Sequence, residues 1–211
     1  MGLHLTLLLF IACFIYSMGI SGWVLAPITQ PLMLAGIAAA ATEFAANKPI
    51  SLLYMSEVIY NFAWIGGVGC TLPLVLMMLF FAKSQRLKAL GKACIVPSLF
   101  NINEPVVFGT IVWNPYLMIP LWINGIVIPL ITWFGFRLVL AAIPHALMQM
   151  WYIPFPFLTW VMSPSLRAML LIVIIFVVTW LIWYPFFRVY DQQTTREELP
   201  MLLKIRKINF E

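Results

Sequence analysis

The sequence has 211 residues, of which 64% are hydrophobic and only 9% are charged. Soluble domains carry about 25% charged residues, so the composition excludes a soluble enzyme and predicts an all-α integral membrane protein. The net charge of +5 does not indicate nucleic-acid binding, because the basic residues gather within 83–92 and within 188–207. Such clusters beside apolar segments are typical of cytoplasmic loops.

The first two apolar stretches are predicted to enter the membrane in different ways. Residues 3–20 are long enough for a spanning helix and lack the basic leader of a signal peptide. A chain that opens directly on a span is unusual for a whole transporter, and we expect that something upstream is missing. The second stretch, 23–46, is broken early by Pro27 and Pro31, so we predict a re-entrant hairpin there.

A glycine-rich segment, 66–69, comes next and favours close packing of helices over phosphate binding. An apolar helix is expected over 71–82, followed by a short basic amphipathic piece over 83–92 at the membrane interface. Two further spans are predicted at 116–143 and 167–187, separated by a loop that is dense in aromatic residues.

The chain is therefore predicted to contain a transmembrane domain, 1–187, and a polar cytoplasmic tail, 188–211. Within this tail, Thr195 and Glu198 have the spacing of a helix cap. We expect the whole to be a polytopic helical bundle with two re-entrant hairpins.

The polar stretch 97–115 is the main candidate for a functional site. Asn101, Asn103 and Glu104 lie between apolar residues, and several Pro and Gly residues prevent one helix from running through them. A carboxylate at membrane depth is costly unless it faces a cavity or a partner. Broken backbone at that depth is tolerated only where protein or water covers it. This stretch is thus predicted to form the second hairpin and a binding site.

No metal or cofactor site is predicted. Cys13, Cys70 and Cys94 lie far apart in apolar surroundings, without the paired spacing of a metal or redox site. They are interpreted as small buried hydrophobic residues.

Several motifs together resemble one known family. The sequence FNINEPVVFG at 100–109, followed by IVWNP at 111–115, resembles the signature of the membrane subunit EIIC of the bacterial sugar phosphotransferase system, lactose/cellobiose branch. GGVGCTL at 66–72 and YPFF at 184–187 resemble further motifs of that family. The resemblance is collinear over nearly the whole chain and corresponds to the C-terminal half of a typical member.

The resemblance implies a multi-pass permease component of the bacterial plasma membrane that binds a disaccharide and presents it to a cytoplasmic EIIB subunit. The phosphoryl donor would then belong to EIIB, and no cofactor is implied, so whether this chain is itself an enzyme stays open. The family's glutamate, here Glu104, is implied to contact the sugar hydroxyls and to help deprotonate the acceptor, with Asn101 and Asn103 lining the site. Because the N-terminal half supplies the dimer contacts, we expect a homo-oligomer or a separate partner half.

Four other positions are carried over as substrate-binding residues. Ser21 stands where the family has a histidine, and a serine cannot hold a proton near neutral pH as imidazole does. Tyr16 and Phe155 occupy aromatic positions of the family, although both could simply pack in the protein. Glu57 corresponds to a frequent hairpin glutamate, with an ordinary solvated charge as the alternative.

Three functions remain open at this point. The leading one is sugar translocation coupled to phosphorylation, which the serine at position 21 would impair. The second is a truncated accessory or regulatory membrane protein that does not transport. The third is a facilitator that passes sugar without phosphorylating it, which Ser21 permits.

Overall fold

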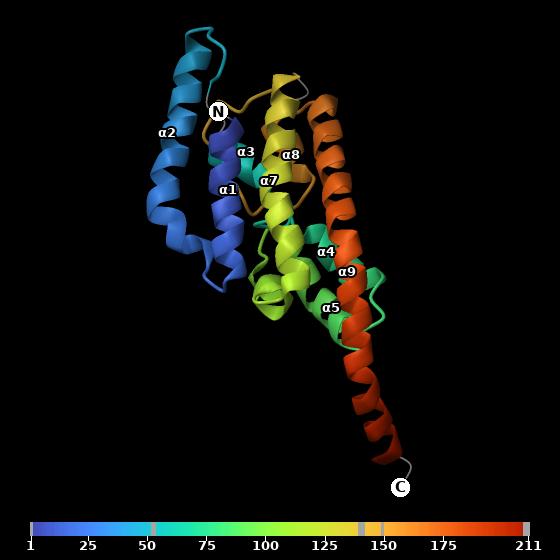
Figure 1. The fold of residues 1–211 in the computed structure, drawn as a ribbon. Coiled ribbons are helices and arrows are strands. Elements are labelled where there is room, and N and C mark those ends of the chain that lie inside the picture. Colours follow the sequence, from blue (N-terminus) through green and yellow to red (C-terminus); the bar gives the residue numbers. More distant parts are fainter. Residues whose placement is uncertain (1, 52–53, 139–141, 149, 209–211) are drawn as a thin grey trace.

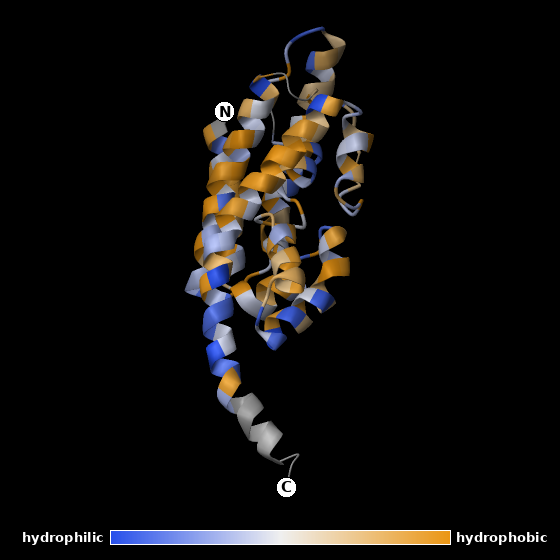
Figure 2. Cartoon of the chain, turned by 90° about the vertical axis from the view of Figure 1, so that its right-hand side faces the viewer, coloured by the Kyte–Doolittle hydropathy of each residue, from blue (hydrophilic) through white to orange (hydrophobic). Residues whose placement is uncertain are grey.

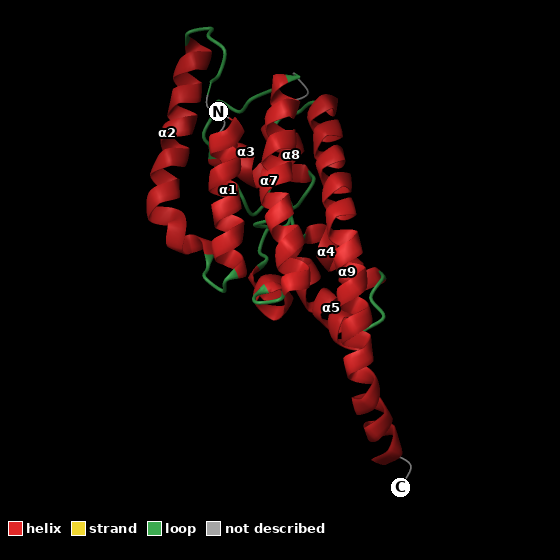
Figure 3. Cartoon of the chain, in the orientation of Figure 1, coloured by secondary structure: helices red, strands yellow, loops and turns green. Residues whose placement is uncertain are grey.

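The computed structural model describes residues 2–51, 54–138, 142–148 and 150–208. Within these ranges the chain is helical and contains no strand (Figure 3). The elements in chain order are α1 (Gly2–Ser17), η1 (Gly22–Leu25), α2 (Ala26–Ala45), α3 (Ser56–Val58), η2 (Ile59–Ala63), α4 (Leu72–Phe80), α5 (Gln85–Leu99), α6 (Glu104–Val106), η3 (Val107–Ile111), α7 (Pro115–Arg137), α8 (Phe157–Met162) and α9 (Leu166–Ile208).

Three apolar helices form the body of the molecule. Helices α1, α7 and α9 lie side by side, with α7 in the middle (Figure 1). Helix α9 comes close to α7 at Gly135, where a Cβ atom would lie only 2.6 Å from Leu171 Cδ1. Within the described residues, 22–45, 115–137 and 166–200 are long and apolar enough to cross a membrane, and Leu3–Ser17 is a shorter apolar helix. The expected spans at the start, middle and end of the chain are therefore present as helices.

The hairpin predicted over 23–46 is wrong, because α2 is one continuous helix that follows the short η1 turn. Pro27 lies in the first turn of α2, where a missing N–H has no intrahelical partner to lose. Pro31 comes four residues later, so the hydrogen bond that it removes is the one to the Pro27 carbonyl, close to the helix start. Two prolines placed in this way leave the rest of the helix intact.

Between α2 and α7 the described backbone is made of short pieces. Two of them, η2 and η3, are π-helical, each directly after a three-residue α-helical turn that contains a glutamate. The helices are interrupted at 64–71 and at 100–103. The polar stretch 97–115 is thus broken, as expected. In its irregular segment, 100–103, Asn101 adopts a left-handed backbone with φ of 60°, which asparagine tolerates well.

Helix α9 continues beyond the predicted end of the last span. Figure 2 shows its apolar colouring giving way to polar residues along the later turns. Thr195 does not begin a new helix, because its hydroxyl donates to the Asp191 carbonyl inside α9. The helix-cap prediction at this place is therefore wrong.

Two carboxylates in the later turns of α9 instead accept hydrogen bonds from the start of α5. Glu198 accepts hydrogen bonds from the Gln85 and Arg86 backbone N–H groups, at 2.9 and 3.0 Å, and from the Ser84 hydroxyl. Asp191 accepts from the backbone N–H groups of Lys83 and Ser84. The first N–H groups of a helix lack intrahelical partners, so the two acids satisfy donors that α5 would otherwise leave open.

Two apolar clusters fill the interior. One joins α1, α2, α3, η2, α7 and α9, and the other joins α1, α4, α5, η3, α7 and α9. Their largest fully buried side chains include Phe62, Met55, Leu74, Met77 and Trp183. The two broken segments, 64–71 and 100–103, contribute to the wall of the cavity described below.

Candidate functional site

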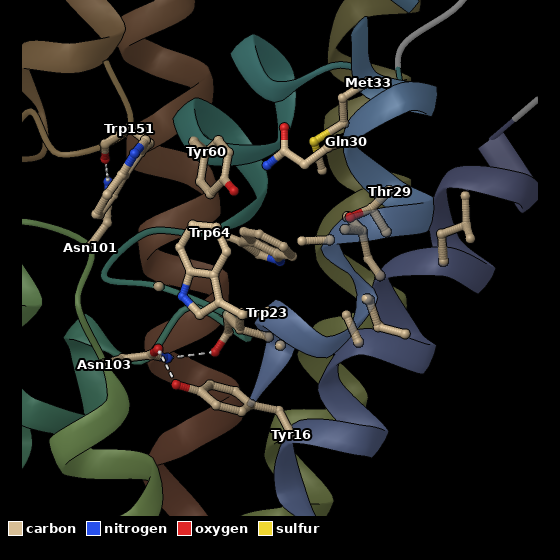
Figure 4. A pocket seen from close by; sticks show the side chains of 18 of the residues that line it. Tyr16, Trp23, Thr29, Gln30, Met33, Tyr60, Trp64, Asn101, Asn103 and Trp151 are labelled. Carbon is tan, nitrogen blue, oxygen red and sulfur yellow. Dashed lines mark hydrogen bonds between the residues drawn. The ribbon is translucent and has the colours of Figure 1, made fainter. Parts of the chain in front are cut away.

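A cavity of about 290 Å³ lies between α1, the start of α2 and the two broken segments. Figure 4 shows side chains reaching it from helices on one side and from irregular backbone on the other. The wall on the side of α1 and α2 is mostly apolar, and includes Leu8, Ala12 and Met33. The opposite wall carries Asn101, Asn103 and Glu104. The three residues singled out in the polar stretch therefore meet at one cavity.

Glu104 is the charged group of this cavity. It is half-buried in the first turn of α6. Among the lining residues of the described chain, it is the only Asp, Glu, Lys or Arg. The Tyr16 hydroxyl lies close enough to interact with its carboxylate. A carboxylate that is not paired with a cation keeps its oxygen lone pairs available for hydroxyl donors of a ligand.

The two asparagines line the cavity, but their amides are bonded to the protein. Asn101 accepts a hydrogen bond from the Gly66 backbone N–H at 2.8 Å and donates one to the Trp151 carbonyl at 2.7 Å. One amide therefore connects two segments that are distant in sequence. A buried amide that is satisfied in this way is a structural connection as well as part of the wall.

Asn103 makes a second set of connections and is only 3% exposed. Its amide oxygen accepts from the Tyr16 hydroxyl at 3.2 Å, and its nitrogen donates to the Val68 carbonyl at 2.9 Å and to Thr71 Oγ1 at 3.1 Å (Figure 4). The amide lies directly against Gly67, whose φ is +98°. The glycine-rich segment thus packs against a polar side chain and not only against helices.

Of the other predicted site residues, Tyr16 lines the cavity, whereas Ser21, Phe155 and Glu57 do not. Ser21 is half-buried at the start of η1, next to Gly22, which does line the cavity, and its hydroxyl accepts from the Trp23 N–H at 3.4 Å. Phe155 stacks on Phe176, with ring centroids 5.5 Å apart and planes 10° apart.

Glu57 is also outside the cavity, and it is not a solvated charge. It is 1% exposed, and its carboxylate accepts from the Met148 N–H at 3.0 Å and from the Ser56 hydroxyl at 2.9 Å. These two bonds offset part of the cost of burying the acid.

Several aromatic residues of the wall were not singled out from the sequence. Tyr60 and Trp64 meet edge to face at 5.2 Å, and Trp151 lies 6.4 Å from Tyr60. Trp23 and, from α2, Gln30 also line the cavity (Figure 4). Among 32 aromatic residues (16 Phe, 9 Trp and 7 Tyr), sequence position alone could not select these, although Trp151 lies in the loop noted for its aromatic residues.

Metal ligation has no candidate in the described part of the chain, where no group of three His, Cys, Asp or Glu side chains could hold an ion. The three cysteines are free and buried. The chemistry available at the cavity is therefore that of one carboxylate, aromatic faces and neutral hydrogen-bonding groups.

Comparison with known proteins places this arrangement in a family. The model of the family described as "Phosphotransferase system, EIIC" matches residues 2–125, more than half of the chain. The chain belongs to the phosphotransferase-system EIIC family. The match to the EIIC family covers α1 through the first half of α7, and so includes Tyr16, Ser21 and the asparagine–glutamate segment. With three candidate spans, this EIIC chain is a membrane protein.

Individual EIIC relatives agree with this assignment. The chain is 34% identical over 189 residues to the lichenan permease IIC component of Bacillus subtilis (strain 168), covering 89% of this chain and 41% of that protein. It is 35% identical over 194 residues to the lactose-specific EIICB component of Lacticaseibacillus casei, covering 88% and 32%.

A solved EIIC structure shows that the fold is shared. The crystal structure of ChbC, the IIC component from the N,N'-diacetylchitobiose-specific phosphotransferase system, matches with a TM-score of 0.87 and 29% identity. This match covers 94% of the chain and 46% of ChbC. The chain therefore spans less than half of the length of each of these three relatives.

Proposed function

We propose that the chain is the sugar-binding part of a phosphotransferase-system permease in the bacterial plasma membrane. The observation that carries this proposal is the meeting of one carboxylate, that of Glu104, with a wall of aromatic rings in one cavity. A carboxylate accepts hydrogen bonds from sugar hydroxyls, and aromatic rings pack on the apolar faces of sugar rings. The cavity volume of about 290 Å³ lies near the lower end of typical ligand pockets, which hold about 300–1,000 Å³.

The proposed substrate is a β-linked disaccharide. The names of related EIIC components refer to lichenan, lactose, cellobiose and oligo-β-mannoside. In this proposal Glu104 binds the sugar hydroxyls and, when coupled to a phosphorylated EIIB, accepts the proton of the attacking hydroxyl. Two of the lactose-specific relatives are named EIICB components, which supports an EIIB partner. A second copy of the chain, or a separate chain that corresponds to the other half of EIIC, would complete the permease.

A binding titration with Glu104→Gln tests the proposal. The purified protein in detergent is titrated with cellobiose, lactose and N,N'-diacetylchitobiose by calorimetry. Loss of a charged hydrogen-bond acceptor is expected to weaken binding by about 10-fold to 100-fold. Glu197→Gln is the matched control, because this glutamate is exposed on α9 and bonded only to Gln193 in the described structure. Equal affinities for the two variants would count against the site.

The serine at position 21 raises a second function, facilitated passage of sugar without phosphorylation, which the similarity to phosphotransferase-system permeases does not favour. Position 21 carries a serine beside the cavity, and neither histidine lines the cavity: His145 instead stacks on Phe44, with centroids 3.6 Å apart. Without an imidazole, this protein would bind and pass sugar with little coupled phosphorylation. Vesicles loaded with EIIB and a phosphoryl donor separate the two functions, because a facilitator would accumulate free sugar and a coupled permease would release sugar phosphate. A non-transporting accessory protein would need neither the cavity nor its carboxylate.

A further inference from the structure

We infer that Asn101 and Glu57 are positioning residues that hold the Trp151 loop, so that the Trp151 ring forms one wall of the cavity and sets its sugar selectivity. The Trp151 loop is defined here as residues 142–148 and 150–156. This inference rests on the proposed function, since it concerns the same cavity. It assigns to Asn101 a framework role in addition to its place in the cavity wall, and to Glu57, which does not line the cavity, a framework role alone.

The first observation is that side chains from other segments hold this loop. The Trp151 carbonyl accepts from Asn101 Nδ2 at 2.7 Å, and the Met148 N–H donates to the Glu57 carboxylate at 3.0 Å. The described loop has no regular secondary structure before α8 begins at Phe157. These two hydrogen bonds therefore help to fix the loop, together with the stacking of His145 on Phe44 and of Phe155 on Phe176.

The second observation is that both ends of the Asn101 amide are bonded to the protein. Its oxygen accepts from the Gly66 N–H at 2.8 Å while its nitrogen holds the Trp151 carbonyl. The same side chain thus fixes the glycine-rich segment and the Trp151 loop relative to each other. Both segments contribute to the cavity wall, through Gly67, Val68 and Trp151.

The third observation concerns Glu57. It is almost fully buried, lies outside the cavity and is bonded to Ser56 and to the loop. A buried carboxylate without hydrogen-bond partners would be strongly destabilising, so the loop N–H and the acid stabilise each other. A role as a sugar ligand is not available to a side chain in this place.

The consequence for selectivity follows from the position of Trp151. Its ring lies 6.4 Å from that of Tyr60, at an interplanar angle of 40°, and both residues line the cavity. A displaced loop would move one aromatic face of the cavity while leaving Glu104 in place. Anchor variants should therefore change which sugar fits, whereas a Glu104 variant should weaken all sugars.

Asn101→Asp tests the first anchor, because the aspartate side chain has nearly the same shape as that of asparagine. Aspartate keeps an oxygen for the Gly66 N–H and tolerates the left-handed backbone, but it replaces the donor to the Trp151 carbonyl by an acceptor. Affinity for a disaccharide is expected to fall by about fivefold to tenfold, and the ratio of cellobiose to glucose affinity should fall with it. Amide hydrogen exchange over 150–156 should become faster with or without sugar.

Asn114→Asp is the matched control for this variant. The Asn114 amide also accepts from a backbone N–H, that of Tyr116 at 3.1 Å, and donates to a backbone carbonyl, that of Thr110 at 2.9 Å. It does not line the cavity. If both Asn→Asp variants change the affinity ratio and the exchange over 150–156 equally, the inference is overturned.

A double variant separates positioning of the ring from general loss of structure. In the Trp151→Ala background, Asn101→Asp should cause no further loss of affinity, because the ring that it positions is absent. An additive loss would contradict the inference. Glu57→Gln retains an oxygen for the Met148 N–H and should bind sugar within about twofold of wild type. A loss as large as that of Glu104→Gln would instead make Glu57 a ligand.

The exchange measurement needs no sugar, which keeps the two proposals apart. If the wild-type protein binds no sugar but exchange over 150–156 responds to Asn101→Asp and not to Asn114→Asp, the proposed function fails and the anchoring stands. If sugar binds and exchange does not respond, the anchoring fails and the proposed function stands.

Discussion

Replacing Gly67 by alanine should disrupt the asparagine side of the cavity. A Cβ at this position would lie 2.4 Å from Asn103 Cγ, 2.6 Å from Oδ1 and 2.8 Å from Nδ2. The Asn103 side chain cannot simply rotate away, because hydrogen bonds to Tyr16, Val68 and Thr71 hold it. The backbone at Gly67, with φ of +98°, is also unfavourable for any residue with a Cβ.

The loss of stability expected for Gly67→Ala is the sum of these two effects. A positive φ costs an alanine about 1–2 kcal/mol. Displacing the Asn103 amide breaks two of its three hydrogen bonds at about 1 kcal/mol each. The total is about 3–4 kcal/mol, and for a chain of this size each 1 kcal/mol lowers the melting temperature by roughly 2–4 °C. We therefore expect a decrease of about 6–16 °C.

Thermal unfolding of the purified protein in detergent, followed by intrinsic fluorescence, measures this change. Gly109→Ala is the control, because its Cβ would meet only the Leu90 side chain, at 3.3 Å, and Gly109 is not among the glycines with positive φ. This control should melt within about 3 °C of wild type, since alanine is a better helix former than glycine. Melting temperatures of the two variants within about 2 °C of each other would refute the reasoning.

Three further variants address other contacts. Tyr16→Phe removes the donor to the Asn103 amide and should lower stability by about 0.5–1.5 kcal/mol; an unchanged melting temperature would mean that this 3.2 Å contact contributes nothing. Ser21→His should raise phosphorylation of sugar in vesicles supplied with EIIB, and no gain would show that position 21 does not limit coupling. Glu198→Gln removes an acceptor at the start of α5 and should speed amide exchange over 85–87 by about fivefold, whereas Glu197→Gln should leave that exchange unchanged.

The class of the protein and most of its long helices followed from the sequence because they depend on local composition. Runs of apolar residues near 115–137 and 166–187 are long enough to span a membrane whatever they pack against. The interruption of helices within 97–115 was equally local, since proline removes a donor and asparagine tolerates the left-handed backbone. The hairpin expected over 23–46 failed because the effect of Pro27 depends on its distance from the helix start, which the sequence did not reveal.

The position of Glu198 shows the limit of spacing rules. Thr195 and Glu198 have the interval of a cap within one helix, but the acid caps α5, more than a hundred residues away in the chain. A carboxylate satisfies any free N–H that the fold brings to it. Which N–H that is depends on how α9 packs beside α5.

What the sequence by itself determined is that Asn101, Asn103, Glu104 and Glu57 need polar partners, because burying such groups without them is costly. That requirement is met equally well by a ligand or by the protein. Only the tertiary structure supplied the protein partners: Asn101 donates to the Trp151 carbonyl, 50 residues away, and Glu57 accepts from the Met148 N–H. Glu104 was left facing the cavity. Pairings across such distances arise from the packing of whole helices, and no local pattern encodes them.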